Sequence, residues 1–322
     1  MRFVIYGAGA IGGTIGARLH RSGCEVLLIA RGAHLDSIRS DGLRFVSPTM
    51  DVRLKIPAVG HPRDADLTTE DVVLLCMKSQ HTEGAVRDLY AVADDSIPVI
   101  CCQNGVANER IALRRFTNTY AMVVYLPAEH LEPGMVVNYA EDTAGMLDAG
   151  RYPRGVDACI TDVASAIAAA GFSSVPDPKI MRLKYAKLLD NLNNAVKAVC
   201  GEGSREIAHE LREEALACYE ASGIEWATED EARKRREGVT DKEVPGKIRH
   251  GGSSLQSVMR GTGDIEADYL NGEIVQLGRL HGVNTPVNAV VQRLGNRMAR
   301  EYLPVGAFTI GDLEAMIEKE RM

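Results

Sequence analysis

Several features that would assign a chain to a specialised class are absent from this sequence of 322 residues. No run approaches the ~20 consecutive apolar residues that a membrane-spanning helix needs, so we expect no membrane association. Basic residues are not in excess, because 37 Lys and Arg stand against 44 Asp and Glu, for a net charge of −7. A mildly acidic chain has no general electrostatic attraction for nucleic acid, and we expect no nucleic-acid partner.

Cysteine and histidine are present, but not in patterns typical of metal sites or disulfides. The seven cysteines are scattered and include no CxxC pair, which argues against a zinc site and a disulfide framework. The eight histidines are dispersed and have no ligand partner at the usual spacing, so we expect no metal. Reduced structural thiols are typical of the cytoplasm, where we expect the protein to reside.

The first half of the chain alternates strand-like and helix-like segments. Short, almost continuous apolar runs are typical of buried parallel strands, and they occur at 2–6, 25–29, 72–76, 97–101 and 120–126. Helical segments are expected at 8–19, 83–92 and 161–170. Strands alternating with helices predict an α/β domain of the Rossmann type, with a doubly wound parallel sheet.

The second half is helical almost to its end. Candidate helices cover 180–200, 205–235, 253–260, 264–282, 286–302 and 310–320. The length favours two domains, which we place at 1–178 (α/β) and 179–322 (all-helical). The charged segment 229–250 mixes both signs, which favours a solvated helix and loop over a nucleic-acid arm. The sequence leaves open whether the helical domain forms a homodimer.

A GxGxxG motif follows the first predicted strand and begins the first predicted helix. In this context the first glycine permits a tight turn, the second lets a pyrophosphate approach the backbone, and the third allows close helix–strand packing. The helix N-terminus adds free N–H groups and a partial positive charge. The alternative is a glycine-rich turn without a ligand. The candidate cofactor residues here are Gly7, Ala8, Gly9, Ala10, Ile11 and Gly12.

The residue at the end of the second strand distinguishes the two nicotinamide cofactors. NAD enzymes place an acid there to bind the ribose 2′-hydroxyl, whereas residues 28–32 contain none. Arg31 would instead meet a 2′-phosphate, which suits a guanidinium, so we predict NADP(H). The alternative is that Arg31 is an ordinary solvated surface charge.

Polar residues also follow two later strands and line one helix. Lys78 and Asn104 come directly after buried strands, where doubly wound sheets bind ligands, although ordinary turn polarity is the alternative. In the segment KYAKLLDNLNN, polar residues run along the margin of an apolar stripe at helical spacing. These polar residues are Lys187, Asn191 and Asn194.

Taken in order, the motifs make the chain resemble the ketopantoate reductases, also called 2-dehydropantoate 2-reductases. The similar segments are GAGAIGG at the start, the MKSQ and QNG turns, K-L-L-x-N at 187–191, SSLQ, E-A-D-Y-L-N-G and HGVNTPVN at 281–288. The resemblance covers nearly the whole chain. It implies an NADPH-dependent reductase that converts 2-dehydropantoate to pantoate, as in pantothenate biosynthesis.

The resemblance also implies roles for individual residues. Lys187 would be the catalytic proton donor to the carbonyl oxygen, and Glu266 would bind the substrate hydroxyl and help to orient the site. On composition and position alone, Glu266 reads as an ordinary helix-dipole partner. Substrate-binding roles fall on Asn104, Asn191 and Ser254, with Asn194 as a further candidate. Cofactor roles fall on Arg31, Lys78 and Asn104.

Two departures from the family pattern bear on the substrate. Ala195 stands where the family often has a second asparagine, and Ser257 stands where an Asp is usual. One alternative is therefore a reductase or dehydrogenase of another 2-keto or 2-hydroxy acid, and a second is a non-catalytic NADP-binding sensor. A further hypothesis concerns Lys184, one turn before Lys187. Repulsion between the two ammonium groups would ease proton release from Lys187.

Overall fold

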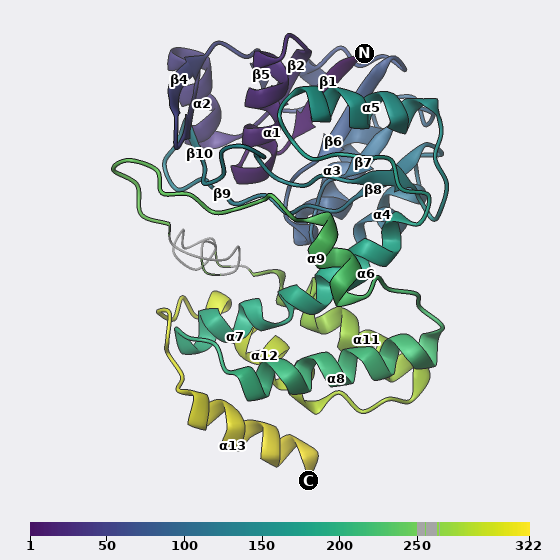
Figure 1. Ribbon diagram of the computed structural model, residues 1–322, viewed down its shortest axis with the longest axis vertical. Helices are drawn as coiled ribbons and strands as arrows, with labels where there is room; N and C mark the ends of the chain where they lie inside the picture. Colours follow the sequence, from purple (N-terminus) through teal and green to yellow (C-terminus); the bar gives the residue numbers. More distant parts are fainter. Residues whose placement is uncertain (250–254, 256–262, 264) are drawn as a thin grey trace. The chain divides into compact units, whose positions relative to one another are not determined.

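The computed structural model describes residues 1–249, 255, 263 and 265–322 (Figure 1). They form two compact units. The first comprises Met1–Lys184 and Thr228–Arg249, and the second comprises Tyr185–Ala227 with the described residues after 249. The change of unit lies slightly beyond the predicted boundary at 178/179, and residues 228–249 belong with the first unit. Within the described residues, no helix is both long and apolar enough to cross a membrane.

A seven-stranded sheet is the central layer of the first unit, in the order β11-β8-β7-β6-β1-β2-β5. All neighbouring strands are parallel except β11 and β8. This arrangement confirms the doubly wound sheet and adds an antiparallel edge strand that was not predicted. The strands are β1 (Arg2–Tyr6), β2 (Glu25–Ile29), β5 (Ala58–Val59), β6 (Asp71–Leu75), β7 (Val99–Cys101), β8 (Thr119–Met122) and β11 (Ala149–Arg151).

Helices cover both faces of this sheet, which explains why its strands are apolar on both sides. Phe3 and Ile5 of β1 belong to a core shared with helices α1 (Ala10–Arg21) and α5 (Ala158–Ala169). Val4, between them, faces the opposite core, shared with α3 (Thr82–Tyr90) and α4 (Asn108–Leu113). Helix α2 (Gly32–Asp41) follows β2.

A second, four-stranded sheet was not predicted from the sequence. Its order is β4-β3-β10-β9, with β3 and β10 parallel and both outer pairs antiparallel. The strands are β3 (Leu43–Ser47), β4 (Met50–Leu54), β9 (Ala128–Glu129) and β10 (Met135–Asn138). This sheet packs closely on α1, because a Cβ added at Gly13 would lie 2.7 Å from Val136 Cγ1. The packing brings the β9–β10 loop beside the start of α1.

The rest of the chain is helical, with more breaks than predicted. The segment 180–200 is two helices separated at Leu192, and 205–235 is interrupted after Gly223, whose positive φ of 64° ends a helix. The predicted helix at 264–282 begins as a 3₁₀ turn, and 253–260 lies outside the described residues except at 255. The elements are α6 (Ile180–Asn191), α7 (Asn193–Cys200), α8 (Arg205–Ser222), α9 (Glu229–Arg235), η3 (Glu266–Tyr269), α11 (Asn271–His281), α12 (Pro286–Arg300) and α13 (Ile310–Arg321).

Candidate active site

The glycine motif forms the turn between β1 and α1. Gly7 has a φ of 102°, and a Cβ there would lie 2.8 Å from the nitrogen of Met77, so only glycine suits this position. The amides of Gly7 and Ala8 both donate to the carbonyl of Ile29, at 3.0 and 3.2 Å, which ties the turn to the end of β2. A Cβ at Gly12 would clash with the Gly7 carbonyl. These constraints match a turn built for close packing.

The same turn fits a dinucleotide pyrophosphate. Gly9 is the N-cap residue of α1, so the first N–H groups of the helix follow it directly. Apart from Gly9 itself and its neighbours along the chain, the one atom of the described residues within 4 Å of a Cβ built on Gly9 is His130 Cδ2, at 3.9 Å. The second glycine therefore leaves space beside the backbone, as close approach of a phosphate requires.

Arg31 lies at the expected end of β2. It is exposed and is the N-cap residue of α2, just beyond the hydrogen bond from Ala30 N to Val59 O. A guanidinium at this place is accessible to a ligand bound along the glycine turn. Arg31 thus lies where the sequence placed it, at the end of β2, and its contact with a 2′-phosphate stays a prediction.

Lys78 and Asn104 lie in neighbouring turns of the first unit. Strands β6 and β7 pair in parallel with Leu75 beside Cys101, so the two turns leave the same edge of the sheet. Lys78 is the N-cap residue of the short 3₁₀ helix η2 (Ser79–His81), and both Lys78 and Asn104 are half-buried. The two turns therefore lie at one edge of the sheet, as expected from their strand ends, and their binding of a ligand stays a prediction.

A buried polar network joins these two turns, and no pattern in the sequence predicted it. The Gln103 side-chain amide donates to Met77 O and to Thr82 Oγ1, each at 2.8 Å. Thr82 in turn donates to Asn108 Oδ1 at 2.8 Å, and Asn108 Nδ2 donates to Asn104 O at 3.0 Å. The side-chain donors of this network are all paired, whereas the buried Gln103 Oε1 has no partner within the described residues. Buried hydrogen bonds of this kind favour one fixed geometry. We conclude that the turn bearing Asn104 is rigidly supported.

Lys184 belongs to this support. Its Nζ donates to Gln103 O at 3.0 Å and forms an ion pair with Glu109 Oε1, and the two side chains are 2% and 0% exposed. The charge of Lys184 is therefore balanced by a carboxylate. This finding argues against the hypothesis that Lys184 raises the acidity of Lys187 by repulsion, because the ion pair cancels most of the field that the hypothesis needs.

The polar margin of the KYAKLLDNLNN segment is present in the second unit. Lys187 is half-buried on α6, and Asn191, the last residue of α6, is buried at 6% exposure. Asn194, on α7, lies 3.4 Å from Asn191, Nδ2 to Oδ1. The Asn191 Nδ2 group is buried without a hydrogen-bond partner within the described part of the chain. Such an orphaned donor is costly and suits a group that meets a ligand oxygen.

The predicted apolar stripe beside this margin is confirmed. All four of its members are 0–1% exposed: Leu188, Leu192, Ala195 and Val199. The break between α6 and α7 falls on this stripe at Leu192. Its carbonyl accepts a hydrogen bond of 3.1 Å from Asn271 Nδ2, which also donates to Asn288 Oδ1 at 3.1 Å. No role was predicted from the sequence for either Asn271 or Asn288.

Glu266 is buried at 4% exposure and begins the 3₁₀ helix η3, which precedes the α-helix α11. Neighbouring Asp268 accepts hydrogen bonds from Gln292 Nε2 at 2.7 Å and Asn296 Nδ2 at 2.6 Å, so η3 is held against α12. Asn271 begins α11 directly after η3, and its side chain donates to Leu192 O. The segment formed by η3 and the start of α11 therefore contacts the break between α6 and α7. Ser254 and Ser257 lie outside the described residues.

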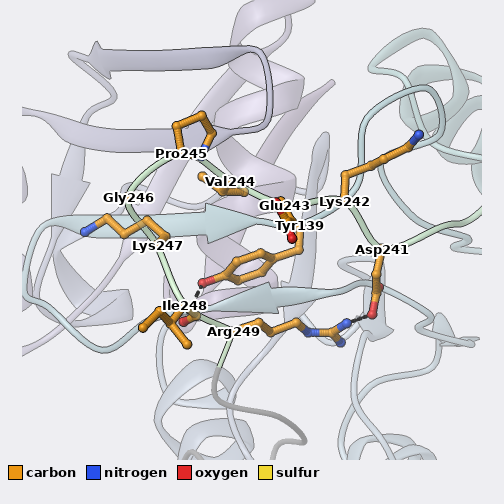
Figure 2. Close-up of a pocket in the computed structure, with 10 residues that line it drawn as sticks. All are labelled: Tyr139, Asp241, Lys242, Glu243, Val244, Pro245, Gly246, Lys247, Ile248 and Arg249. Carbon is orange, nitrogen blue, oxygen red and sulfur yellow. Dashed lines mark hydrogen bonds and ion pairs between the residues drawn. The ribbon is translucent and has the colours of Figure 1, made fainter.

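One sizeable cavity lies elsewhere in the first unit, as Figure 2 shows. Its volume is about 930 Å³, and Tyr139 lines it together with residues 241–249. The Tyr139 hydroxyl is within hydrogen-bond distance of Glu129 Oε2 (3.0 Å) and Ile248 O (3.2 Å). No residue predicted for the site lines this cavity. Across the described residues, no group of three or more His, Cys, Asp or Glu could hold a metal ion.

Comparison with known proteins agrees with the geometry. Residues 3–150 match the family described as Ketopantoate reductase PanE/ApbA, and residues 179–299 match its C-terminal part. The 2-dehydropantoate 2-reductase of Halobacterium salinarum is 28% identical over 302 residues, which is 89% of this chain and 95% of that protein. That of Archaeoglobus fulgidus is 29% identical over 303 residues, with 91% and 96% covered.

Solved structures share the fold. A PanE/ApbA family ketopantoate reductase from Ralstonia eutropha has a TM-score of 0.76 and 26% identity, with 100% of both chains covered. D-mandelate dehydrogenase, in a ternary structure with NADH and anilino(oxo)acetate, has a TM-score of 0.79 and 23% identity, with 94% of this chain and 99% of that chain covered. At this identity the second likeness concerns the fold alone.

Proposed function

This chain belongs to the ketopantoate reductase family, and on that premise we propose that it transfers a hydride from NADPH to the ketone of a 2-keto acid. The proposed substrate is 2-dehydropantoate and the product is pantoate. The main support is the glycine turn between β1 and α1 together with an exposed arginine, in place of an acid, at the end of β2. A cytoplasmic location is part of the proposal, since all seven cysteines are free.

The cofactor assignment depends on Arg31. When bound, the nicotinamide supplies the hydride, and the residues of the turn bind the pyrophosphate through backbone N–H groups. The exposed Arg31 guanidinium is the group that would favour a 2′-phosphate over a 2′-hydroxyl. D-mandelate dehydrogenase is named with NADH, so a direct comparison of NADPH with NADH is the necessary test.

The catalytic role is assigned to Lys187. Hydride addition leaves negative charge on the substrate oxygen, which an ammonium group stabilises and then protonates. Asn191 lies one turn further along α6, and its Nδ2, buried without a partner among the described residues, would supply a hydrogen-bond donor for the same substrate. Glu266 would accept a hydrogen bond from the substrate hydroxyl, Asn104, Asn194 and Ser254 would bind the substrate, and Lys78 would bind the cofactor.

A substrate panel with purified protein tests this proposal. NADPH oxidation is measured with 2-dehydropantoate, with the keto acid of mandelate and with other 2-keto acids, and each is repeated with NADH. We expect turnover with 2-dehydropantoate and NADPH, and a fall in kcat of at least about 100-fold in Lys187→Ala, the usual scale of general acid catalysis. Lys197→Ala, an exposed lysine on α7, is the matched control.

Each other result selects an alternative. Turnover of a different acid would identify another member of the same reaction class, which the departure at Ala195 makes the second candidate. Cofactor binding without turnover of any acid would favour a non-catalytic sensor. A strong preference for NADH would refute the argument from Arg31.

A further inference from the structure

A histidine on α2 contacts the backbone of the glycine turn. His34 Nε2 lies 2.7 Å from the carbonyl oxygen of Ala8, and the amide of Gly134 donates to His34 Nδ1 at 2.8 Å. Because Nδ1 accepts a hydrogen bond, the neutral ring must carry its proton on Nε2 and donate it to Ala8. Burial lowers the pKa of His34, which favours this neutral form.

The position of the Ala8 carbonyl determines the direction of the next amide. The Ala8–Gly9 peptide is trans and planar, so its C=O and N–H bonds point in opposite directions. The carbonyl is enclosed on the side of α1 as well, because a Cβ at Gly13 would lie 2.7 Å from Ala8 O. The Gly9 N–H therefore points away from His34.

The histidine is itself held in place by the β9–β10 loop. The ring of His130 packs on His34 with centroids 4.1 Å apart and an interplanar angle of 48°. His130 Nδ1 lies 2.9 Å from Met135 O and donates to it. Gly134, which supplies the amide to His34, has a φ of 75° and abuts Ser37 of α2. The small sheet thus fixes the ring whose Nε2–H contacts the turn.

We propose that His34 is a positioning residue for cofactor binding: it holds the Ala8–Gly9 peptide so that the Gly9 N–H faces the pyrophosphate of the dinucleotide. A reversed peptide would present the Ala8 carbonyl oxygen to an anion, which is repulsive. This inference rests on the proposed binding of a nicotinamide dinucleotide at the glycine turn. On this proposal His34, which is distant in sequence from the glycine motif, determines whether the motif can bind the dinucleotide.

The proposal predicts an effect that does not depend on which dinucleotide binds. The pyrophosphate is common to NADPH and NADH, and a neutral histidine adds no charge for the 2′-phosphate. Loss of His34 should therefore weaken both cofactors equally and leave their affinity ratio unchanged. Loss of Arg31 should change that ratio, because it removes a charge near the 2′-phosphate only. A general loss of structure would instead lower the stability and the amount of binding-competent protein.

The experiment compares dissociation constants of NADPH and NADH for full-length variants by fluorescence titration. His34→Phe keeps an aromatic ring against His130 but removes both hydrogen bonds, and we expect it to weaken both cofactors about 10-fold. His34→Gln retains a donor for Ala8 and an acceptor for Gly134, and we expect affinities within about 3-fold of the original chain. His209→Phe, at an exposed position on α8, is the control for the added ring.

Four outcomes would overturn the inference. Unchanged affinity in folded His34→Phe would show that the peptide keeps its orientation without the histidine. A loss confined to NADPH would place the effect at the 2′-phosphate, and a Gln variant as weak as the Phe variant would remove the hydrogen bonds as the cause. If the original chain binds neither cofactor, the proposed function fails and the inference fails with it. If the Phe side chain prevents folding, His34→Ala makes the same test with a smaller residue.

Discussion

The ion pair between Lys184 and Glu109 gives a prediction that can be worked from its burial. Lys184→Met would leave the Glu109 carboxylate buried and uncompensated, with an oxygen, Oε2, that already has no hydrogen-bond partner in the described structure. Removing one partner of a buried pair costs about 3–5 kcal/mol of unfolding free energy. Replacing both partners, in Lys184→Met with Glu109→Leu, should restore stability to within about 1 kcal/mol, because the desolvation cost of two charges is removed with their attraction.

The assay is thermal unfolding followed by far-ultraviolet circular dichroism, with Lys197→Met as an exposed control. For a unit of this size the single variant should lower the melting temperature by roughly 6–20 °C. The reasoning would be refuted by a single variant that loses less than about 1 kcal/mol, or by a double variant as unstable as the two single changes combined. The double variant should also keep the pH–rate profile of the original chain, since Lys184 is balanced by Glu109 and does not tune Lys187.

Three further predictions concern the cofactor turn. Arg31→Ala should raise the KM for NADPH about 10-fold or more and leave that for NADH nearly unchanged, as measured by initial rates. Gly12→Ala should abolish binding of both cofactors, because its Cβ would clash with the Gly7 carbonyl; normal affinity in a titration would contradict the described turn. The stability contributed by neutral His34 should be fully present above its ordinary pKa of 6.5 and decrease as the pH falls below 6.5 toward its lowered folded-state pKa. Urea unfolding at several pH values would measure this loss, which His34→Gln should not show.

The sequence predicted those parts of the fold that depend on local pattern. Strands β1 and β2 were placed with their observed limits because both are short apolar runs bounded by glycine or charged residues. The four-stranded sheet was missed because it depends on pairing between distant segments, such as Arg44 with Met135. Its strand β4 also shows only partial burial, so its sequence lacks the apolar run that reveals a buried strand.

The same distinction applies to the candidate site. Motif positions such as Gly7, Gly12 and Arg31 could be found because each has a fixed relation to a nearby strand. The residues that support them could not, because Lys184 meets Glu109 across 75 positions and Gly134 meets His34 across 100. Such contacts leave no periodic or spacing signal in a single sequence. The helix break at Leu192 was missed because the apolar stripe of Leu188, Leu192, Ala195 and Val199 keeps helical spacing through it.

The alanine at position 195 gives a final test of substrate choice. Ala195 is 1% exposed on α7, and a Cβ at Gly295 of α12 would lie 3.7 Å from its methyl group, so the site is a close apolar contact between helices. An asparagine here would bury an amide without room for partners and should cost about 1–3 kcal/mol. We expect Ala195→Asn to lower the melting temperature without improving turnover of 2-dehydropantoate, whereas Asn194→Ala should raise the substrate KM with little loss of stability. A stable Ala195→Asn variant with faster turnover would instead show that position 195 faces the substrate.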